Sequence, residues 1–303
     1  TSRCLTLSCS APALVFRPLT PMPLRIAIAA LFLTSGALGV IDEVLWARLL
    51  GLHLGHAATA HATVVATFLL GLGVGYAWLG RQADTLARPL RRYGVLEVGI
   101  GLWCLAFPYL LKVALTGLDA LSGLTGPNPL VAGPVGRSLL AAVLLLPPTI
   151  AMGGTLPSLI RLLGSGPAAG GRAPATLYGL NSLGAVLGGL LAGFYLLEAR
   201  GMARSMAFAG LGSVLVGLVA LAMDHGSALA RVASEVPRRH LGETTSAAPS
   251  ERTIAQLTSE LRRPEVQAAW AIALLSGLAA LLMQTLWFRV FGVVLGSSAY
   301  VFA

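Results

Sequence analysis

Seven runs of about 20 predominantly apolar residues recur along this chain and constrain its fold more than any other feature. The runs cover residues 24–46, 58–80, 93–115, 138–160, 176–197, 203–223 and 270–290. A helix of that length crosses the roughly 30 Å hydrocarbon layer of a bilayer and satisfies its own backbone hydrogen bonds there. The predicted fold class is therefore an all-α, integral membrane, polytopic helix bundle.

Charged residues are too few for an ordinary soluble domain. Asp, Glu, Lys and Arg make up 11% of the 303 residues, whereas a soluble domain carries about 25%, and the mean hydropathy is +0.79. The net charge is +9, but the arginines lie in short clusters between apolar runs rather than along one basic face with interleaved aromatic residues. The lipid bilayer is therefore the predicted partner, and nucleic acid is not.

Arginines accumulate in alternate loops, which predicts an orientation. The loops after the second, fourth and sixth runs hold Arg81, Arg88, Arg91 and Arg92, then Arg161 and Arg172, then Arg231, Arg238, Arg239, Arg252, Arg262 and Arg263. The loop 116–136 contains no basic residue. Because positive side chains near helix ends stay in the cytoplasm, the N-terminus is predicted to be cytoplasmic. The use of Arg rather than Lys, with abundant Ala, Gly and Leu, favours a GC-rich bacterial genome and hence the inner membrane.

The predicted spans divide the chain into four parts. Residues 1–23 lack the features of a cleaved signal and are predicted to be an N-terminal tail, with Met22 as the expected natural start. Residues 24–223 form a six-helix transmembrane unit, and residues 224–265 form a polar cytoplasmic linker. Residues 266–303 supply the first helix of a second, truncated transmembrane unit, so the chain is expected to be a fragment.

An internal repeat supports the division into two units. Residues 33–62 align without gaps with residues 274–303. The identical pairs include Ser35-Gly36 with Ser276-Gly277, Leu45-Trp46 with Leu286-Trp287, Arg48 with Arg289, Gly51 with Gly292, and Leu54-Gly55 with Leu295-Gly296. Six helices return the chain to its starting side, so both units are predicted to insert in the same direction, as the halves of major-facilitator transporters do.

The first run carries a cluster of charged and aromatic side chains, namely Asp42, Glu43, Trp46 and Arg48. A carboxylate at membrane depth is costly and marks a substrate, ion or proton site. Counted from residue 24 at 1.5 Å per residue, however, Glu43 falls roughly 28 Å along the helix, near the outer interface, where water and Arg48 stabilise it. An interfacial cluster and a functional carboxylate are both open interpretations.

Glu97 stands near the predicted cytoplasmic start of the third helix and also has two interpretations. Arg81, Arg91 and Arg92 are close to it in sequence on the same predicted side. Ion pairing with these arginines is one interpretation. The other is a gating contact of the type that major-facilitator proteins place at that loop.

Glycines recur at helical spacing inside the apolar runs. The segment 71–75 looks like a nucleotide-binding loop only superficially, because it follows no strand. Close helix packing is the better explanation for Gly71 and Gly75, and the same spacing recurs at Gly184 and Gly188.

Prolines interrupt the fourth run at Pro147-Pro148 and again at Pro157. Proline donates no backbone hydrogen bond, so this helix is predicted to be broken or kinked. Discontinuous helices often frame transporter sites, which makes Thr155 a candidate substrate or ion ligand, and a kink filled by neighbouring helices is the alternative. Asn181, within the fifth run, needs a polar partner, either another helix or a bound molecule.

No metal or cofactor site is predicted in this chain. Cys4, Cys9 and Cys104 are too few and too irregularly spaced for a zinc site or a disulfide framework. His53 and His56 are three residues apart, but no carboxylate or thiol stands at ligand spacing beside them.

Three motifs together resemble the membrane region of the fused major-facilitator/spermidine-synthase-like proteins of bacteria. The motifs are Ser35-Gly36 followed by Asp42-Glu43-Val44-Leu45-Trp46-Ala47-Arg48-Leu49-Leu50-Gly51, Met152-Gly153-Gly154-Thr155-Leu156-Pro157, and Leu177-Tyr178-Gly179-Leu180-Asn181-Ser182-Leu183-Gly184-Ala185-Val186-Leu187-Gly188. The resemblance covers most of residues 31–219. It implies a multi-span bundle followed, in family members, by a cytoplasmic Rossmann-like domain related to aminopropyltransferases.

Two functions are compatible with this resemblance. Such a catalytic domain needs a Gly-rich loop after a strand and acids that hold a diamine, and no segment here supplies them, so no catalytic residue is carried over. The first function is transport of, or access for, a polyamine or other small cation. Its candidate residues are Asp42, Glu43, Trp46, Arg48, Thr155 and Asn181. The second is a membrane anchor or regulator, without transport, of a C-terminal aminopropyltransferase-like domain.

Overall fold

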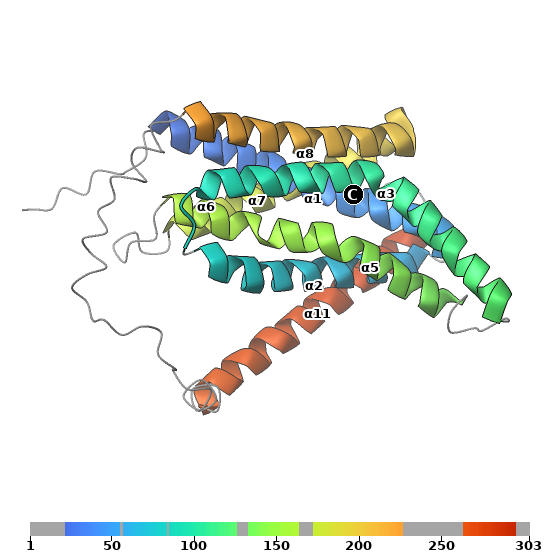
Figure 1. The fold of residues 1–303 in the computed structure, drawn as a ribbon. Coiled ribbons are helices and arrows are strands. Elements are labelled where there is room, and N and C mark those ends of the chain that lie inside the picture. Colours follow the sequence, from blue (N-terminus) through green and yellow to red (C-terminus); the bar gives the residue numbers. More distant parts are fainter. Residues whose placement is uncertain are drawn as a thin grey trace, which may run out of the picture.

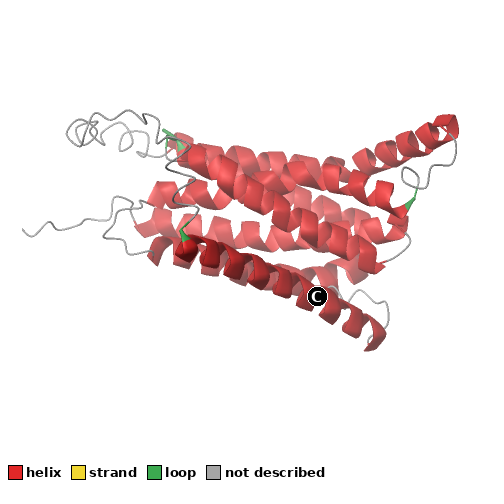
Figure 2. Cartoon of the chain, turned by 90° about the horizontal axis from the view of Figure 1, so that it is seen from below, coloured by secondary structure: helices red, strands yellow, loops and turns green. Residues whose placement is uncertain are grey.

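The computed structural model describes residues 22–54, 57–83, 85–125, 133–163, 172–226 and 263–294, and every regular element within them is a helix (Figure 2). The elements are α1 (Met22–Leu54), α2 (Ala57–Ala83), α3 (Pro89–Thr125), α5 (Pro134–Gly153), α6 (Thr155–Leu163), α7 (Arg172–Leu191), the π-helix η2 (Ala192–Arg200), α8 (Gly201–Gly226) and α11 (Pro264–Val294). Residues 1–21, most of the predicted linker and the pair Leu295-Gly296 of the repeat lie outside the described residues.

Six stretches of the described residues are long and apolar enough to cross a membrane. The fifth, Pro174–His225, has 52 residues, and a straight helix of that length would extend roughly 78 Å, more than twice the hydrocarbon layer. The chain instead turns at Gly201, whose φ of 70° lies in the left-handed region that glycine adopts freely. Ser205 Oγ donates a hydrogen bond back across this turn to the Leu196 carbonyl (2.9 Å). The fifth stretch therefore folds back on itself, with α8 returning beside η2 and packing on α1 and α3 (Figure 1).

The helices enclose a common interior. α1 packs on α2, α2 on α5, α5 on α3, α3 on α8, and α8 returns to α1, so these five helices form a closed ring. α7 packs on α1, and α11 contacts α2 while leaving most of its apolar side chains exposed (Figure 1). The largest side chains of the interior include Trp46, Tyr93, Phe32 and Phe107.

Most helices extend beyond the apolar runs that predicted them. α1 continues eight residues past the predicted end at residue 46, through Arg48 and His53 to Leu54. α3 begins before residue 93 and ends after residue 115. Polar side chains end an apolar run but not the backbone hydrogen-bonding pattern, so these predicted boundaries were too short.

The helix formed by the fourth run is broken, as predicted, but the break does not lie at the adjacent prolines. α5 continues through Pro147 and Pro148 and ends at Gly153. The Gly154 N–H then bonds the Ala151 carbonyl (3.0 Å), and α6 begins at the next residue. The interruption lies six residues after Pro148 and three residues before Pro157. Pro157 has no N–H to bond a carbonyl of the preceding turn, so the break falls beside the second predicted proline.

Glycines of α2 lie where its backbone approaches α5 most closely. A Cβ on Gly71 would collide with the side chain of Thr149, and a Cβ on Gly75 would collide with the backbone of Ile150. The absence of side chains at these two positions lets the two backbones touch.

Glycines of α7 occupy the same kind of position against α1. A Cβ on Gly184 would meet the Leu33 carbonyl, and a Cβ on Gly188 would meet the backbone of Ala37. The four-residue spacing places both glycines on one face of α7, and this face is the one that contacts α1.

Candidate functional site

Polar side chains of α1 and α3 meet inside the ring of helices. Ser35 Oγ donates a hydrogen bond to Glu97 Oε1 (2.5 Å), and Cys104 Sγ donates one to Asp42 Oδ1 (2.7 Å). Both pairs join residues that are 62 positions apart in the sequence. When two helices run side by side in the same direction, neighbouring residues keep the same separation in the sequence. A single alignment of α1 with α3 therefore brings both pairs together.

The spacing of these residues along each helix explains why they share the interior. Ser35 and Asp42 are seven residues apart on α1, and Glu97 and Cys104 are seven apart on α3. Seven residues are close to two turns of an α-helix, so each pair lies on a single face of its helix. The two polar faces are therefore turned toward each other.

Both carboxylates are removed from solvent within the bundle. The exposed fraction is 0% for Asp42 and 1% for Glu97. Within the described ranges neither side chain forms an ion pair, and the arginines Arg88 and Arg137 pair instead with Asp224 and Asp119. A buried carboxylate is stable only when a proton, a cation or several hydrogen bonds offset its charge.

Two atoms of α1 have hydrogen-bonding capacity that the described residues do not use. Asp42 Oδ2 is buried and accepts no hydrogen bond from them, and Trp46 Nε1 is buried and donates none to them. Asp42 and Trp46 are four residues apart and so lie one turn from each other on the same face. Trp46 is held in place by Phe107 of α3, with ring centroids 5.4 Å apart.

Tyr93 completes the Glu97 end of the site. Its hydroxyl donates a hydrogen bond to the Leu31 carbonyl of α1 (3.4 Å) and lies near Glu97. Its ring packs edge-on against Phe32, with centroids 6.4 Å apart. Glu97 thus accepts a hydrogen bond from Ser35 of α1, and Tyr93 ties the same part of α3 to α1.

The arginines that are close to Glu97 in sequence do not pair with it in the structure. Arg92 Nη2 instead donates to the Leu79 carbonyl (2.9 Å) and lies 3.4 Å from Gln82 Oε1, which ties the end of α2 to the start of α3. Five residues separate Arg92 from Glu97, so the two side chains leave α3 in different directions. The ion-pair interpretation of Glu97 is therefore wrong.

The other predicted site residues lie at different places. Glu43 and Arg48 are partly buried on α1, and α1 continues for 11 residues beyond Glu43. The Thr155 hydroxyl donates to the Met152 carbonyl (2.7 Å) at the helix break. Asn181 of α7 lies against α1, because a Cβ on Gly36 would stand 2.7 Å from Asn181 Oδ1.

Sequence reasoning selected Asp42 and Trp46 but did not select the residues of α3 that face them. Ser35, Tyr93 and Cys104 were not predicted to take part in a site. A signal for two of the contacts was present, namely the matching seven-residue spacing of polar residues in two apolar runs. Across the described ranges, no three His, Cys, Asp or Glu side chains gather as metal ligands would.

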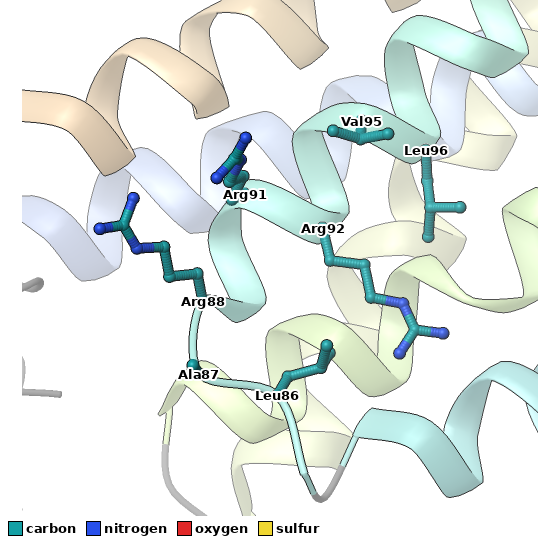
Figure 3. A pocket seen from close by; sticks show the side chains of 7 residues that line it. All are labelled: Leu86, Ala87, Arg88, Arg91, Arg92, Val95 and Leu96. Carbon is teal, nitrogen blue, oxygen red and sulfur yellow. The ribbon is translucent and has the colours of Figure 1, made fainter.

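Two surface pockets lie away from the carboxylates. One, with a cavity volume of about 460 Å³, lies at the start of α3 (Figure 3). The other, of about 180 Å³, lies between η2 and α8. Neither of these pockets is lined by Asp42 or Glu97, and both carboxylates are buried among the helices.

Comparison with known proteins identifies no family for this chain. No protein-family model matches it, and neither a curated protein nor a solved structure matches it. The part of the chain that the structure describes is an all-helical bundle, with six stretches able to cross a membrane by length and composition and with the buried carboxylates of Asp42 and Glu97.

Proposed function

We propose that this chain is a multi-pass membrane protein whose interior carboxylates bind a small cation and pass it across the bilayer. One observation carries the proposal: Asp42 is completely buried, and its Oδ2 has no hydrogen-bond partner within the described ranges. An acid at this depth is costly unless it serves an ion or proton path. Glu97, on the facing helix, provides a second acid in the same interior.

The ligand chemistry follows from the side chains present. Two carboxylates attract a positive charge, and no arginine or lysine of the described residues is paired with either of them. Trp46 adds an aromatic ring and an N–H group beside Asp42, and aromatic rings attract cations through their faces. The resemblance to spermidine-synthase-like membrane proteins supports a polyamine or another small amine as the cation.

The proposed orientation places the start of α1 in the cytoplasm of a bacterial cell. The end of α2, the start of α3 and the end of α8 lie at the same end of the bundle as the start of α1 (Figure 1). Arg81, Arg88 and Arg91 belong to this end, and positive side chains are retained on the cytoplasmic side.

The proposal is tested by cation uptake into vesicles that contain the purified protein, with spermidine, putrescine and a proton-sensitive dye as separate probes. Asp42→Asn and Glu97→Gln are each expected to lower uptake of the transported cation about tenfold to a hundredfold, because each removes a charged acceptor from the path. Glu198→Gln, on the exposed surface of η2, is the matched control and should transport at the wild-type rate. Unchanged uptake of every probe in both variants would contradict the assignment of Asp42 and Glu97 as the cation site.

A second function, anchoring and regulation of a cytoplasmic enzyme domain, is favoured by the enclosure of the carboxylates. Neither surface pocket reaches them, and large side chains fill the interior around them. This alternative predicts no uptake of any probe by the wild-type protein. It also predicts that the reading frame beyond residue 303 encodes a βαβ nucleotide-binding fold, which translation of the gene to its stop codon checks.

A further inference from the structure

The pocket at the start of α3 combines arginines with apolar side chains. Its lining residues are Leu86, Ala87, Arg88, Arg91, Arg92, Val95 and Leu96. The cavity volume is about 460 Å³ and the pocket opens to the outside of the bundle. Figure 3 shows Arg88 just before α3 and Arg91 in its first turn, with Arg92 directed to the other side.

The charge of this pocket is positive. Arg88 Nη1 lies 3.9 Å from Asp224 Oδ2 of α8, while Arg91 is exposed and forms no ion pair within the described ranges. Arg92 Nη2 donates a hydrogen bond to the Leu79 carbonyl of α2. Arg92 Nη1 is buried and has no hydrogen-bond partner among the described residues. The first turn of α3 contains no acid, and the N-terminus of a helix itself favours anions. The side of the pocket that carries Arg88 and Arg91 therefore has two guanidinium groups and one neighbouring carboxylate, that of Asp224.

An exposed apolar strip continues from the pocket along α3. Val95, Leu102 and Tyr109 are 55%, 56% and 74% exposed, and they repeat every seven residues on one face. The strip extends about 21 Å along the helix axis, more than the depth of one leaflet, which is about 15 Å. A ligand that suits both regions has an anionic head and a long apolar tail.

We propose that this pocket binds an anionic phospholipid of the surrounding leaflet, with its phosphate at Arg88 and Arg91 and one acyl chain along Val95 and Leu102. The proposal rests on the membrane insertion proposed above and not on cation transport. Cytoplasmic leaflets are rich in anionic lipid, and basic pockets beside membrane helices bind such headgroups. The largely apolar wall disfavours a free phosphate ion, which would gain nothing from Val95.

Native mass spectrometry of the full chain in detergent tests the site, with phosphatidylglycerol and phosphatidylcholine of identical acyl chains as probes. The wild-type protein is expected to bind phosphatidylglycerol in preference to phosphatidylcholine. The double variant Arg88→Gln/Arg91→Gln should lose affinity for phosphatidylglycerol roughly 30-fold, about fivefold for each arginine. Arg81→Gln, an exposed arginine of α2 at the same end, is the charge-matched control and should retain wild-type affinity.

Four outcomes would overturn the lipid site: equal binding of the two lipids by the wild-type protein, full retention of phosphatidylglycerol by the double variant, an equal loss in Arg81→Gln, or displacement of the lipid by the same concentration of inorganic phosphate. Circular dichroism shows whether the double variant keeps its helices. If the double variant does not, the single variant Arg91→Gln takes its place.

Flotation with vesicles of pure phosphatidylcholine separates the lipid site from the proposed membrane insertion. A chain that fails to float contradicts membrane insertion, whereas one that floats without lipid preference contradicts only this pocket.

Discussion

Replacement of Gly188 by leucine is expected to destabilise the bundle by about 3 kcal/mol or more. A Cβ at this position would lie 2.8 Å from the Cα of Ala37. A side chain there would collide with backbone atoms, which cannot move aside by changing a rotamer. α7 must then move away from α1, and the contact along Gly184 and Gly188 is lost. Unfolding in mild detergent by titration with a denaturing detergent, followed by circular dichroism, measures the change in the free energy of unfolding.

Gly179→Leu on the same helix is the matched control for this prediction. A Cβ at Gly179 meets no atom within 4 Å, so the same substitution there should leave the free energy of unfolding within about 1 kcal/mol of the wild type. Equal stability of the Gly188→Leu and Gly179→Leu variants would contradict the described contact between α7 and α1.

Trp46→Ala is expected to lower the free energy of unfolding by about 3–5 kcal/mol. Trp46 has no exposed surface and packs against Phe107 across the interior, so its removal leaves a cavity between α1 and α3. The same detergent titration measures this loss. Cation uptake should fall with it, because Trp46 lies one turn from Asp42.

Trp78→Ala is the corresponding control on α2. Trp78 is 59% exposed on the surface of the bundle, so its removal opens no cavity and the expected change is below about 1 kcal/mol. If Trp46→Ala and Trp78→Ala lowered the free energy of unfolding by equally small amounts, Trp46 would not occupy the packed interior that the structure assigns to it.

The helical character of the chain could be predicted because apolar runs of membrane length favour one regular structure. The fifth and sixth runs, residues 176–197 and 203–223, were predicted as separate helices, and the backbone reverses between them at Gly201. The position of the break after α5 was predicted only in part. The helix accommodates Pro147 and Pro148, and the interruption falls at Gly154, three residues before Pro157, the second predicted interruption.

The candidate site was only half predictable for a physical reason. Asp42 was recognised because a charge within an apolar run is energetically costly. Trp46 was recognised because it is a large aromatic residue next to that charge in the same helix. Their neighbours on α3 depend on the register between two helices, which the packing of the whole ring determines. Cys104 is 62 residues from Asp42. For Glu97, ion pairing with arginines was one of two interpretations, because those were its nearest charges in the sequence.

The most direct test of the central claim is whether the interior carboxylates react with a lipid-soluble carbodiimide and whether a cation protects them. A protonated carboxyl group adds to the carbodiimide and forms a stable acylurea, which peptide mass spectrometry locates. The account predicts an adduct on Asp42 or Glu97 in membrane vesicles, and its suppression by the cation that the vesicles accumulate. An adduct that forms at the same rate with and without every cation probe, or its absence from both residues, would contradict a cation site between α1 and α3.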